Sequence, residues 1–298
     1  MNQTLKPIRM EFGRHETFTI RHGWLGKGLE RLGSPEGFAA DTATADKLGL
    51  GSRMVRSLAY WLEASGLADV VMEGRSRRLN MSDIGRVIDA NDAYVEYPGT
   101  LWFLQLAIAS RDGSAPAWFF NDYLERSFER AACVEAFLRY AKQRATKTPT
   151  LQSTQRDVAN VLASYAYNPT EAQDPEDGTI CPLIELRLVT YHRDTRRFEK
   201  VRPVDPVPIE AVLAAASSCS NGEETLSVMD LASRRHGPGR LFGLSPEMID
   251  RAAQEGARIY AKSGVTYVLL GAERRLSVPN RPPAWWLERH YRRIERQA

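Results

Sequence analysis

Long apolar runs and paired cysteines are both missing from this chain. No apolar run approaches the ~20 residues needed to cross a bilayer, and residues 1–10 contain no apolar stretch followed by a small-residue cleavage site. The three cysteines, Cys133, Cys181 and Cys219, lie far apart, in a spacing that fits neither a disulfide framework nor a zinc site. We therefore expect a cytoplasmic protein without membrane contact, whose thiols are reduced and bind no metal.

The sequence also lacks the common catalytic signatures. The phosphate-binding pattern G-x-x-x-x-G-K-[ST], the nucleophile elbow G-x-S-x-G and the zinc-protease pattern H-E-x-x-H do not occur. His15, Glu16 and His22 could supply metal ligands, but they also fit the polar positions of a short edge strand, in which Phe18 and Ile20 alternate with polar residues. No catalytic residue, metal or cofactor is expected, and the protein is predicted not to be an enzyme.

One acidic stretch keeps a metal-dependent activity open. Residues 171–177 contain four acids and no base, and Asp174, Glu176 and Asp177 could bind a divalent cation through their carboxylate oxygens. A solvated acidic loop explains the same residues without a metal. A nuclease that uses this loop is therefore the least favoured of the functions considered.

Charge is distributed unevenly along the 298 residues. The 40 basic residues nearly balance the 37 acidic ones, which leaves a net charge of +3, and 33 of the basic residues are arginine. Arginine outnumbers acid over residues 52–78 and 271–298, on either side of the acidic stretch. With 43% hydrophobic and 26% charged residues, the composition is that of a globular protein, and its basic ends are compatible with nucleic-acid contact.

A compact pattern near the N-terminus has the order of a winged helix-turn-helix. Residues 42–48 predict a short helix, residues 49–51 a tight glycine turn, and residues 53–65 a second helix that Ser52 caps. A hairpin with a basic turn follows over residues 67–81. In such motifs the second helix enters the major groove of DNA and the wing contacts the backbone. The predicted DNA-binding residues are Arg53, Arg56, Ser57, Tyr60, Arg75, Arg77 and Arg78.

The rest of the chain completes an α+β, mainly helical fold. A buried helix over residues 100–110 and an amphipathic one over 126–144 form a helical middle segment. Helices and a hairpin beyond Pro208 repeat the first pattern, with a turn at 237–239 and a helix that Ser245 caps. We therefore predict winged helix-turn-helix modules at the N- and C-terminal parts around the helical middle. The predicted domains are residues 1–96, 97–149 and 150–298.

The C-terminal tail combines aromatic side chains with arginine. Residues 279–283 are rich in proline, which directs the chain away from the preceding hairpin, and residues 284–294 predict a short helix. Aromatic anchors beside arginine are typical of protein interfaces, whereas the alternative is that the tryptophan pair folds back onto the core. The predicted partner-binding residues are Trp285, Trp286, Arg289, Tyr291 and Arg292.

Three segments resemble a known bacterial family, the domain of unknown function 4007. They are FGRHETFTIRHGWL at residues 12–25, DVANVLASY at 157–165 and PEDGTICPLIEL at 175–186. The resemblance implies a protein encoded beside DNA-phosphorothioation genes in phage-defence clusters, often with a sulfonucleotide-reductase-like protein. Because the family's activity is unassigned, the resemblance implies no catalytic residues.

Together these observations predict a non-catalytic DNA-binding or scaffolding subunit of a DNA-modification and phage-defence complex. Its expected partners are double-stranded DNA and a sulfonucleotide-reductase-like or sulfur-transfer enzyme of the same cluster. A winged-helix transcriptional regulator of a defence operon is the alternative.

Overall fold

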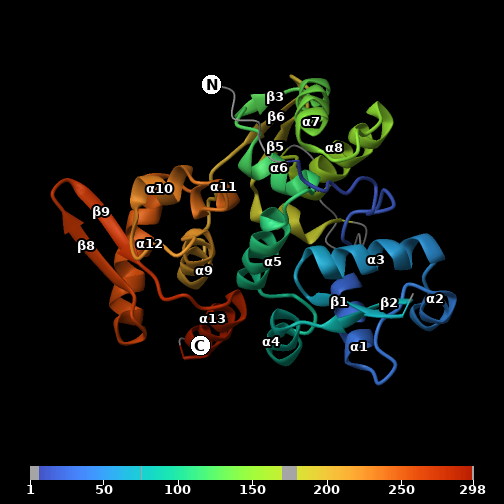
Figure 1. The fold of residues 1–298 in the computed structure, drawn as a ribbon, viewed down its shortest axis with the longest axis horizontal. Helices are drawn as coiled ribbons and strands as arrows, with labels where there is room; N and C mark the ends of the chain where they lie inside the picture. Colours follow the sequence, from blue (N-terminus) through green and yellow to red (C-terminus); the bar gives the residue numbers. More distant parts are fainter. Residues whose placement is uncertain (1–6, 75, 170–179, 297–298) are drawn as a thin grey trace.

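The computed structural model describes residues 7–74, 76–169 and 180–296. Within these ranges helices predominate, and the strands form small sheets of two, four and three strands (Figure 1). This confirms the predicted mainly helical α+β class. No helix in the described part of the chain is both long and apolar enough to span a bilayer.

The N-terminal part contains a helical pair beside a hairpin. Its elements are α1 (Trp24–Gly33), α2 (Thr42–Leu48), α3 (Ser52–Ala64), β1 (Ala68–Glu73), β2 (Ser76–Met81) and α4 (Asp83–Asn91). Val55, Leu58 and Leu62 recur on one face of α3 and are fully buried. Phe38, in the connection between α1 and α2, forms an antiparallel bridge with Leu79 and so adds a third, one-residue strand beside β2.

Two local predictions in this part are wrong. Residues 18–20 form no strand, because Glu16 and Thr17 just before them have φ of 51° and 72° and turn the chain sharply. Ser52 lies inside α3, whose N-cap is Gly51 and which has no side-chain cap. The glycine turn that the sequence indicated is nevertheless present, with Gly49 at φ 63° ending α2.

The middle segment and the residues after it share one sheet. The elements are α5 (Pro98–Ser110), α6 (Ala115–Asn121), β3 (Ser127–Phe128), α7 (Arg130–Arg144), α8 (Leu151–Tyr165), β4 (Ala166–Tyr167), the 3-10 helix η1 (Pro182–Leu186), β5 (Val189–His192) and β6 (Arg197–Lys200). The sheet order is β3-β6-β5-β4. The helix predicted from residue 126 begins at Arg130, because Ser127 and Phe128 pair with β6 instead.

The C-terminal part repeats the order of elements seen at the N-terminus. It contains α9 (Ile209–Cys219), β7 (Leu226–Ser227), α10 (Val228–Ser233), α11 (Pro238–Phe242), α12 (Pro246–Tyr260), the 3-10 helix η2 (Ala261–Ser263), β8 (Thr266–Leu270), β9 (Glu273–Ser277) and α13 (Pro283–Glu295). Ser245 caps α12 as predicted, accepting a hydrogen bond from the Met248 N–H at 3.3 Å. The turn predicted at 237–239 instead leads into α11, with Gly237 as its N-cap.

The two ends of the chain also share a strand order. At the N-terminus Phe38 pairs with β2, which pairs with β1, and at the C-terminus β7 pairs with β9, which pairs with β8. In each part a helix precedes the first strand, and further helices lie between that strand and the hairpin. The last strand of the hairpin is the central strand of the sheet. The repeat expected from the sequence is therefore present at the level of topology, with α11 as an additional short helix in the second copy.

Helix α13 packs between the two ends of the molecule. It contacts α9, α4 and α5 (Figure 1), with Trp286 and Leu287 fully buried. The approach to α5 is close, because a Cβ on Gly99 would lie 2.0 Å from His290 Nε2. The buried apolar side chains form one continuous cluster from Ile20 to Tyr291. The division into three domains stays a prediction.

A buried carboxylate fixes the position of α13. Glu210 in α9 has no solvent exposure, and its oxygens accept hydrogen bonds from Tyr260 in α12 and from His290 and Arg293 in α13, at 2.5, 3.2 and 2.6 Å. Burial alone would raise the pKa of the Glu210 carboxyl, but these hydrogen bonds outweigh burial and lower the pKa to about 2.

We expect Glu210→Gln to lower the free energy of unfolding by about 3 kcal/mol at pH 7, since removing one partner leaves buried polar groups uncompensated. The depressed pKa means that the carboxylate's contribution is complete above pH 4.5 and is lost as the pH falls toward 2. Thermal melts should therefore show a wild-type advantage at pH 7 that shrinks below pH 4. Glu288→Gln, on the exposed face of α13, is the control, with an expected effect below about 1 kcal/mol. A difference that does not change with pH would contradict this role.

Candidate nucleic-acid interface

The first turns of α3 present two exposed arginines, and one carboxylate binds both. The side chains of Arg53 and Arg56 are 60% and 49% exposed. Their Nε atoms donate to the Glu16 carboxylate at 3.1 and 2.8 Å. The hydrogen bond from Arg56, followed by that from Arg53, holds the pKa of Glu16 below its usual range. Both positive charges are therefore partly neutralised by the protein's own N-terminal loop.

Ser57 and Tyr60 do not face solvent, contrary to the prediction. Ser57 has no exposure, and its hydroxyl donates to the backbone carbonyl of His15 at 2.9 Å. Tyr60 is 6% exposed and packs edge-on against the His15 ring. The face of α3 that would have carried them to DNA is covered by residues 13–18, so neither side chain can contact a base in this structure.

The arginines of the predicted wing, on the β1–β2 hairpin, are bound to the body of the protein. Arg77 donates to Glu63, which also accepts from Arg14 and Arg111 at 3.2 and 2.8 Å. Arg78 donates to the backbone carbonyl of Glu36 at 3.1 Å. Arg75, the third predicted wing residue, lies outside the described residues. The structure thus brings Arg77 close to α3 through Glu63, but both described wing arginines already have acceptors.

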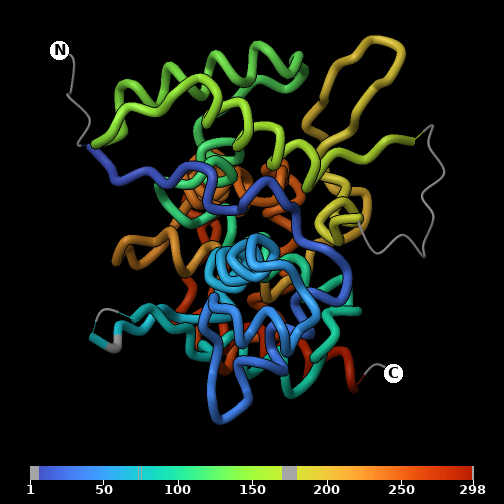
Figure 2. Tube along the Cα trace, turned by 90° about the vertical axis from the view of Figure 1, so that its right-hand side faces the viewer, coloured from blue at the N-terminus to red at the C-terminus, as the bar shows by residue number. Residues whose placement is uncertain are grey.

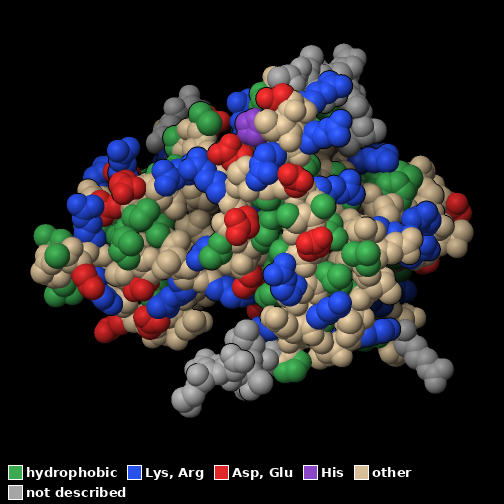
Figure 3. Space-filling view, turned by 90° about the horizontal axis from the view of Figure 1, so that it is seen from above, with side chains coloured by type: hydrophobic (Ala, Val, Ile, Leu, Met, Phe, Trp, Pro, Cys, Tyr) green, Lys and Arg blue, Asp and Glu red, His purple; other side chains and the backbone are tan. Residues whose placement is uncertain are grey.

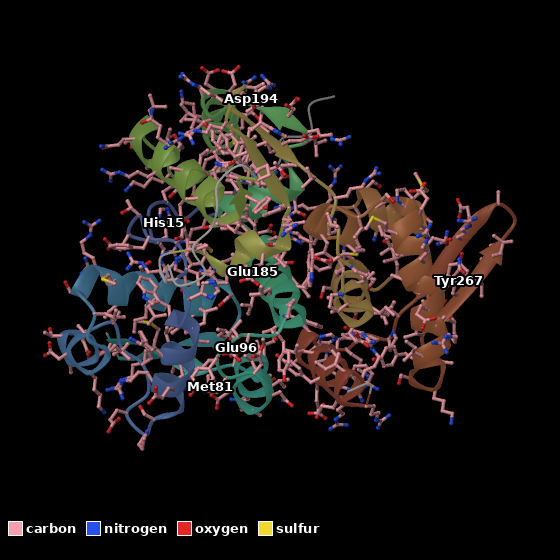
Figure 4. All side chains as sticks on the ribbon, turned by 180° about the vertical axis from the view of Figure 1, so that it is seen from behind. His15, Met81, Glu96, Glu185, Asp194 and Tyr267 are labelled. Atoms are coloured by element: carbon pink, nitrogen blue, oxygen red, sulfur yellow. The ribbon has the colours of Figure 1, made fainter. Side chains whose placement is uncertain are left out.

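The loop that covers α3 is itself held from the middle of the chain. His15 lies in this loop (labelled in Figure 4). In α8, Asp157 Oδ1 lies 2.8 Å from His15 Nε2 and accepts from the Gly13 N–H at 2.8 Å. The Thr17 N–H donates to His15 Nδ1, so the ring hydrogen is on Nε2. Asp157 Oδ2 has no partner among the described residues. Sequence reasoning missed this anchor, because 142 residues separate the two side chains and nothing local indicates that they meet.

The predicted partner-binding residues of α13 divide into two groups. Trp286 and Tyr291 are 0% and 2% exposed, so they belong to the core and are unavailable to a partner in this structure, which is the alternative that the sequence left open. Trp285 is partly exposed, with the guanidinium groups of Arg281 and Arg289 over its ring. Arg292 is exposed and pairs with Glu288 on the same helix. Docking through Trp285, Arg289 and Arg292 stays a prediction.

The described residues offer little for metal or thiol chemistry. No group of three or more His, Cys, Asp or Glu side chains in residues 7–74, 76–169 and 180–296 could hold a metal ion. All three cysteines are buried, and burial raises the thiol pKa to about 12 for Cys133 and Cys181 and to about 11 for Cys219. Thiols that remain protonated at neutral pH are poor nucleophiles. The acidic stretch 171–177 lies outside the described residues.

Comparison with known proteins identifies the family of this chain. The model of the protein family of unknown function DUF4007 matches residues 12–279. The chain belongs to this family. Two solved structures have the fold of this DUF4007 protein. One is the SspB crystal structure: the match covers 99% of this chain and 92% of the SspB chain, with a TM-score of 0.83. The other is the magnesium ion-bound SspB crystal structure: the match covers 96% of this chain and 89% of that chain, with a TM-score of 0.82. Both are 24% identical to this chain, and no curated protein matches it.

Deleting residues 284–298 should destabilise the DUF4007 protein, because it removes the buried side chains of Trp286, Leu287 and Tyr291. We expect the truncated protein to melt at a temperature at least about 10 °C lower, or to aggregate, because the loss of these buried side chains lowers the free energy of unfolding by several kcal/mol. The double substitution Arg289→Ala and Arg292→Ala leaves those core residues in place and should change the melting temperature little. If the double variant keeps its partner in a pull-down from the host, the tail is structural and the docking prediction fails.

Proposed function

We propose that this protein is a non-catalytic DNA-binding subunit of a DNA-modification and defence complex, and that its N-terminal part is a winged helix-turn-helix. The observation that carries the proposal is the pairing of Phe38 with Leu79. It places one strand between α1 and α2 and makes the last strand of the wing central, which is the arrangement of elements in a winged helix. The same strand order in the C-terminal part supports a second module of this kind.

The exposed end of α3 supports binding to duplex DNA. Helix-turn-helix proteins read the major groove with the N-terminal residues of the second helix, and Arg53 and Arg56 lie in the first turns of α3. With Ser57 and Tyr60 buried, the proposed interface is confined to these two arginines and to Arg77 and Arg78 of the wing. Their present acceptors are carboxylates and a backbone carbonyl, which phosphate oxygens can replace with similar geometry.

The place of the protein in a complex rests on its family. The family resemblance implies a gene that lies beside DNA-phosphorothioation genes, and two structures of this fold are named SspB. We propose a sulfonucleotide-reductase-like or sulfur-transfer enzyme as the protein partner. A transcriptional regulator with the same module would bind one palindromic operator selectively, whereas a subunit of a modification complex would bind duplexes of many sequences.

Replacing Arg53 and Arg56 with alanine should weaken binding to a fluorescent DNA duplex in an anisotropy titration. The slope of log affinity against log salt should become shallower by about 0.9 for each phosphate that the variant no longer binds, and Arg77→Ala with Arg78→Ala should act in the same direction. Glu16→Gln should tighten binding several-fold, because it removes the carboxylate that competes with phosphate for both arginines.

The gain from Glu16→Gln should vanish when Arg53 and Arg56 are already alanine. Arg139→Ala, an exposed arginine on α7 outside both proposed modules, serves as the control for removal of charge alone. Unchanged affinity and salt slope in both double variants would rule out this surface as the interface.

A magnesium-dependent nuclease is the second candidate, favoured by the magnesium ion bound in one SspB structure. The described residues contain no group that fits a metal, which leaves the acidic stretch 171–177 as the candidate ligand set. If that stretch binds Mg²⁺, Asp177→Asn should abolish metal-dependent nicking of a supercoiled plasmid without changing duplex affinity. Nicking that persists in this variant, or that never occurs with Mg²⁺, would reject the assignment to this loop.

A further inference from the structure

A row of aromatic rings crosses the four-stranded sheet from the core to the surface. Phe128 on β3 lies opposite Phe198 on β6, which lies opposite Tyr191 on β5. Neighbouring ring centroids are 5.9 and 4.7 Å apart. Phe128 is 2% exposed, whereas Phe198 and Tyr191 are only partly buried. The row therefore ends in two accessible rings on a hairpin that projects from the body (Figure 2).

These two rings form one wall of a groove of about 440 Å³. Ala159 and Ala163 of α8 also line the groove, and their small side chains leave space in it. Arg130 and Arg193 also line the groove. Its size falls within the range of roughly 300–1,000 Å³ that is usual for ligand pockets.

The charge of the groove distinguishes it from the α3 surface. No aspartate or glutamate is among its described lining residues, and Arg130 and Arg193 are exposed, with no hydrogen bond or ion pair in the described part of the chain. Seen from above, the molecule shows Lys and Arg side chains spread over its face with Asp and Glu side chains between them (Figure 3). Two cations without acceptors favour an anionic ligand.

Aromatic rings beside free arginines match one class of ligand especially well. Proteins that bind single strands stack unpaired bases on aromatic side chains and hold the phosphates with a basic groove, and sheets commonly supply such rings. Duplex DNA does not fit this geometry, since its bases are stacked inside the helix and cannot reach Tyr191 or Phe198.

We infer that this groove binds a single-stranded segment of nucleic acid, with an unpaired base on Tyr191 and Phe198 and its flanking phosphates on Arg130 and Arg193. The site is separate from the proposed duplex interface, because its described lining residues come from α7, α8, β4, the residue after β4 and the β5–β6 hairpin, and none comes from α3 or the wing. The inference therefore does not depend on the duplex proposal.

The test is an anisotropy titration of the full-length protein with fluorescein-labelled (dT)12, with (rU)12 to compare DNA with RNA. Tyr191→Leu keeps an apolar side chain but removes the stacking surface, and it should weaken binding about tenfold, while Tyr191→Phe should bind as the wild type does. Arg193→Ala should make the salt slope shallower by about 0.7, the value for one single-strand phosphate. Arg139→Ala, exposed on α7 and not among the groove's lining residues, is again the charge control.

Several outcomes would overturn the inference. Equal affinity of Tyr191→Leu and wild type would show that no base stacks there, and equally strong competition by an oligoglutamate of the same charge would show that only charge matters. Arg193 lies in an exposed turn, so Arg193→Ala tests the groove even if Tyr191→Leu proves less stable in a thermal melt. Abolished (dT)12 binding in the Arg53→Ala, Arg56→Ala double variant would mean that strands and duplexes share the α3 site, and the groove would then be rejected.

Discussion

The buried carboxylate of Glu210 joins three helices of the C-terminal part through hydrogen bonds. It lies in α9, accepts hydrogen bonds from α12 and α13, and is completely desolvated. Such a group is tolerated only when its partners are in place. Because α13 also packs on α4 and α5, these donors help to orient the C-terminal part on the N-terminal part, together with the buried hydrogen bond between Thr100 and Tyr291.

Arginine is abundant in this protein, yet in the N-terminal part several arginines are paired with the protein's own carboxylates. Arg53 and Arg56 bind Glu16, and Glu63 accepts from three arginines of the N-terminal half. A basic sequence segment therefore does not by itself become a basic surface. Any phosphate that binds α3 must displace a carboxylate, whereas one that binds beside the β5–β6 hairpin meets arginines without acceptors among the described residues.

Periodicity and turn chemistry were sufficient to predict most helices, the β1–β2 and β8–β9 hairpins and the repeated order of elements. The spacing of Val55, Leu58 and Leu62 identifies the buried face of α3, and Ser245 followed by proline identifies the start of α12. The covered face of α3 was unpredictable, because it depends on the interaction between His15 and Asp157. Local pattern also cannot separate Trp285 from Trp286, whose different exposures are set by the position of α13 on α9.

The anchor at Asp157 has a consequence for the order of events during synthesis. Residues 13–18 leave the ribosome long before α8 does, and their buried partner is 142 residues away. Contacts between such distant segments form late, after the local elements have folded. The nascent chain can thus complete α1, α2, α3 and the wing while the N-terminal loop has no carboxylate to bind. During that interval the loop has only its contacts with α3 to keep it in place, those of Glu16 with Arg53 and Arg56 and that of Ser57 with the His15 carbonyl.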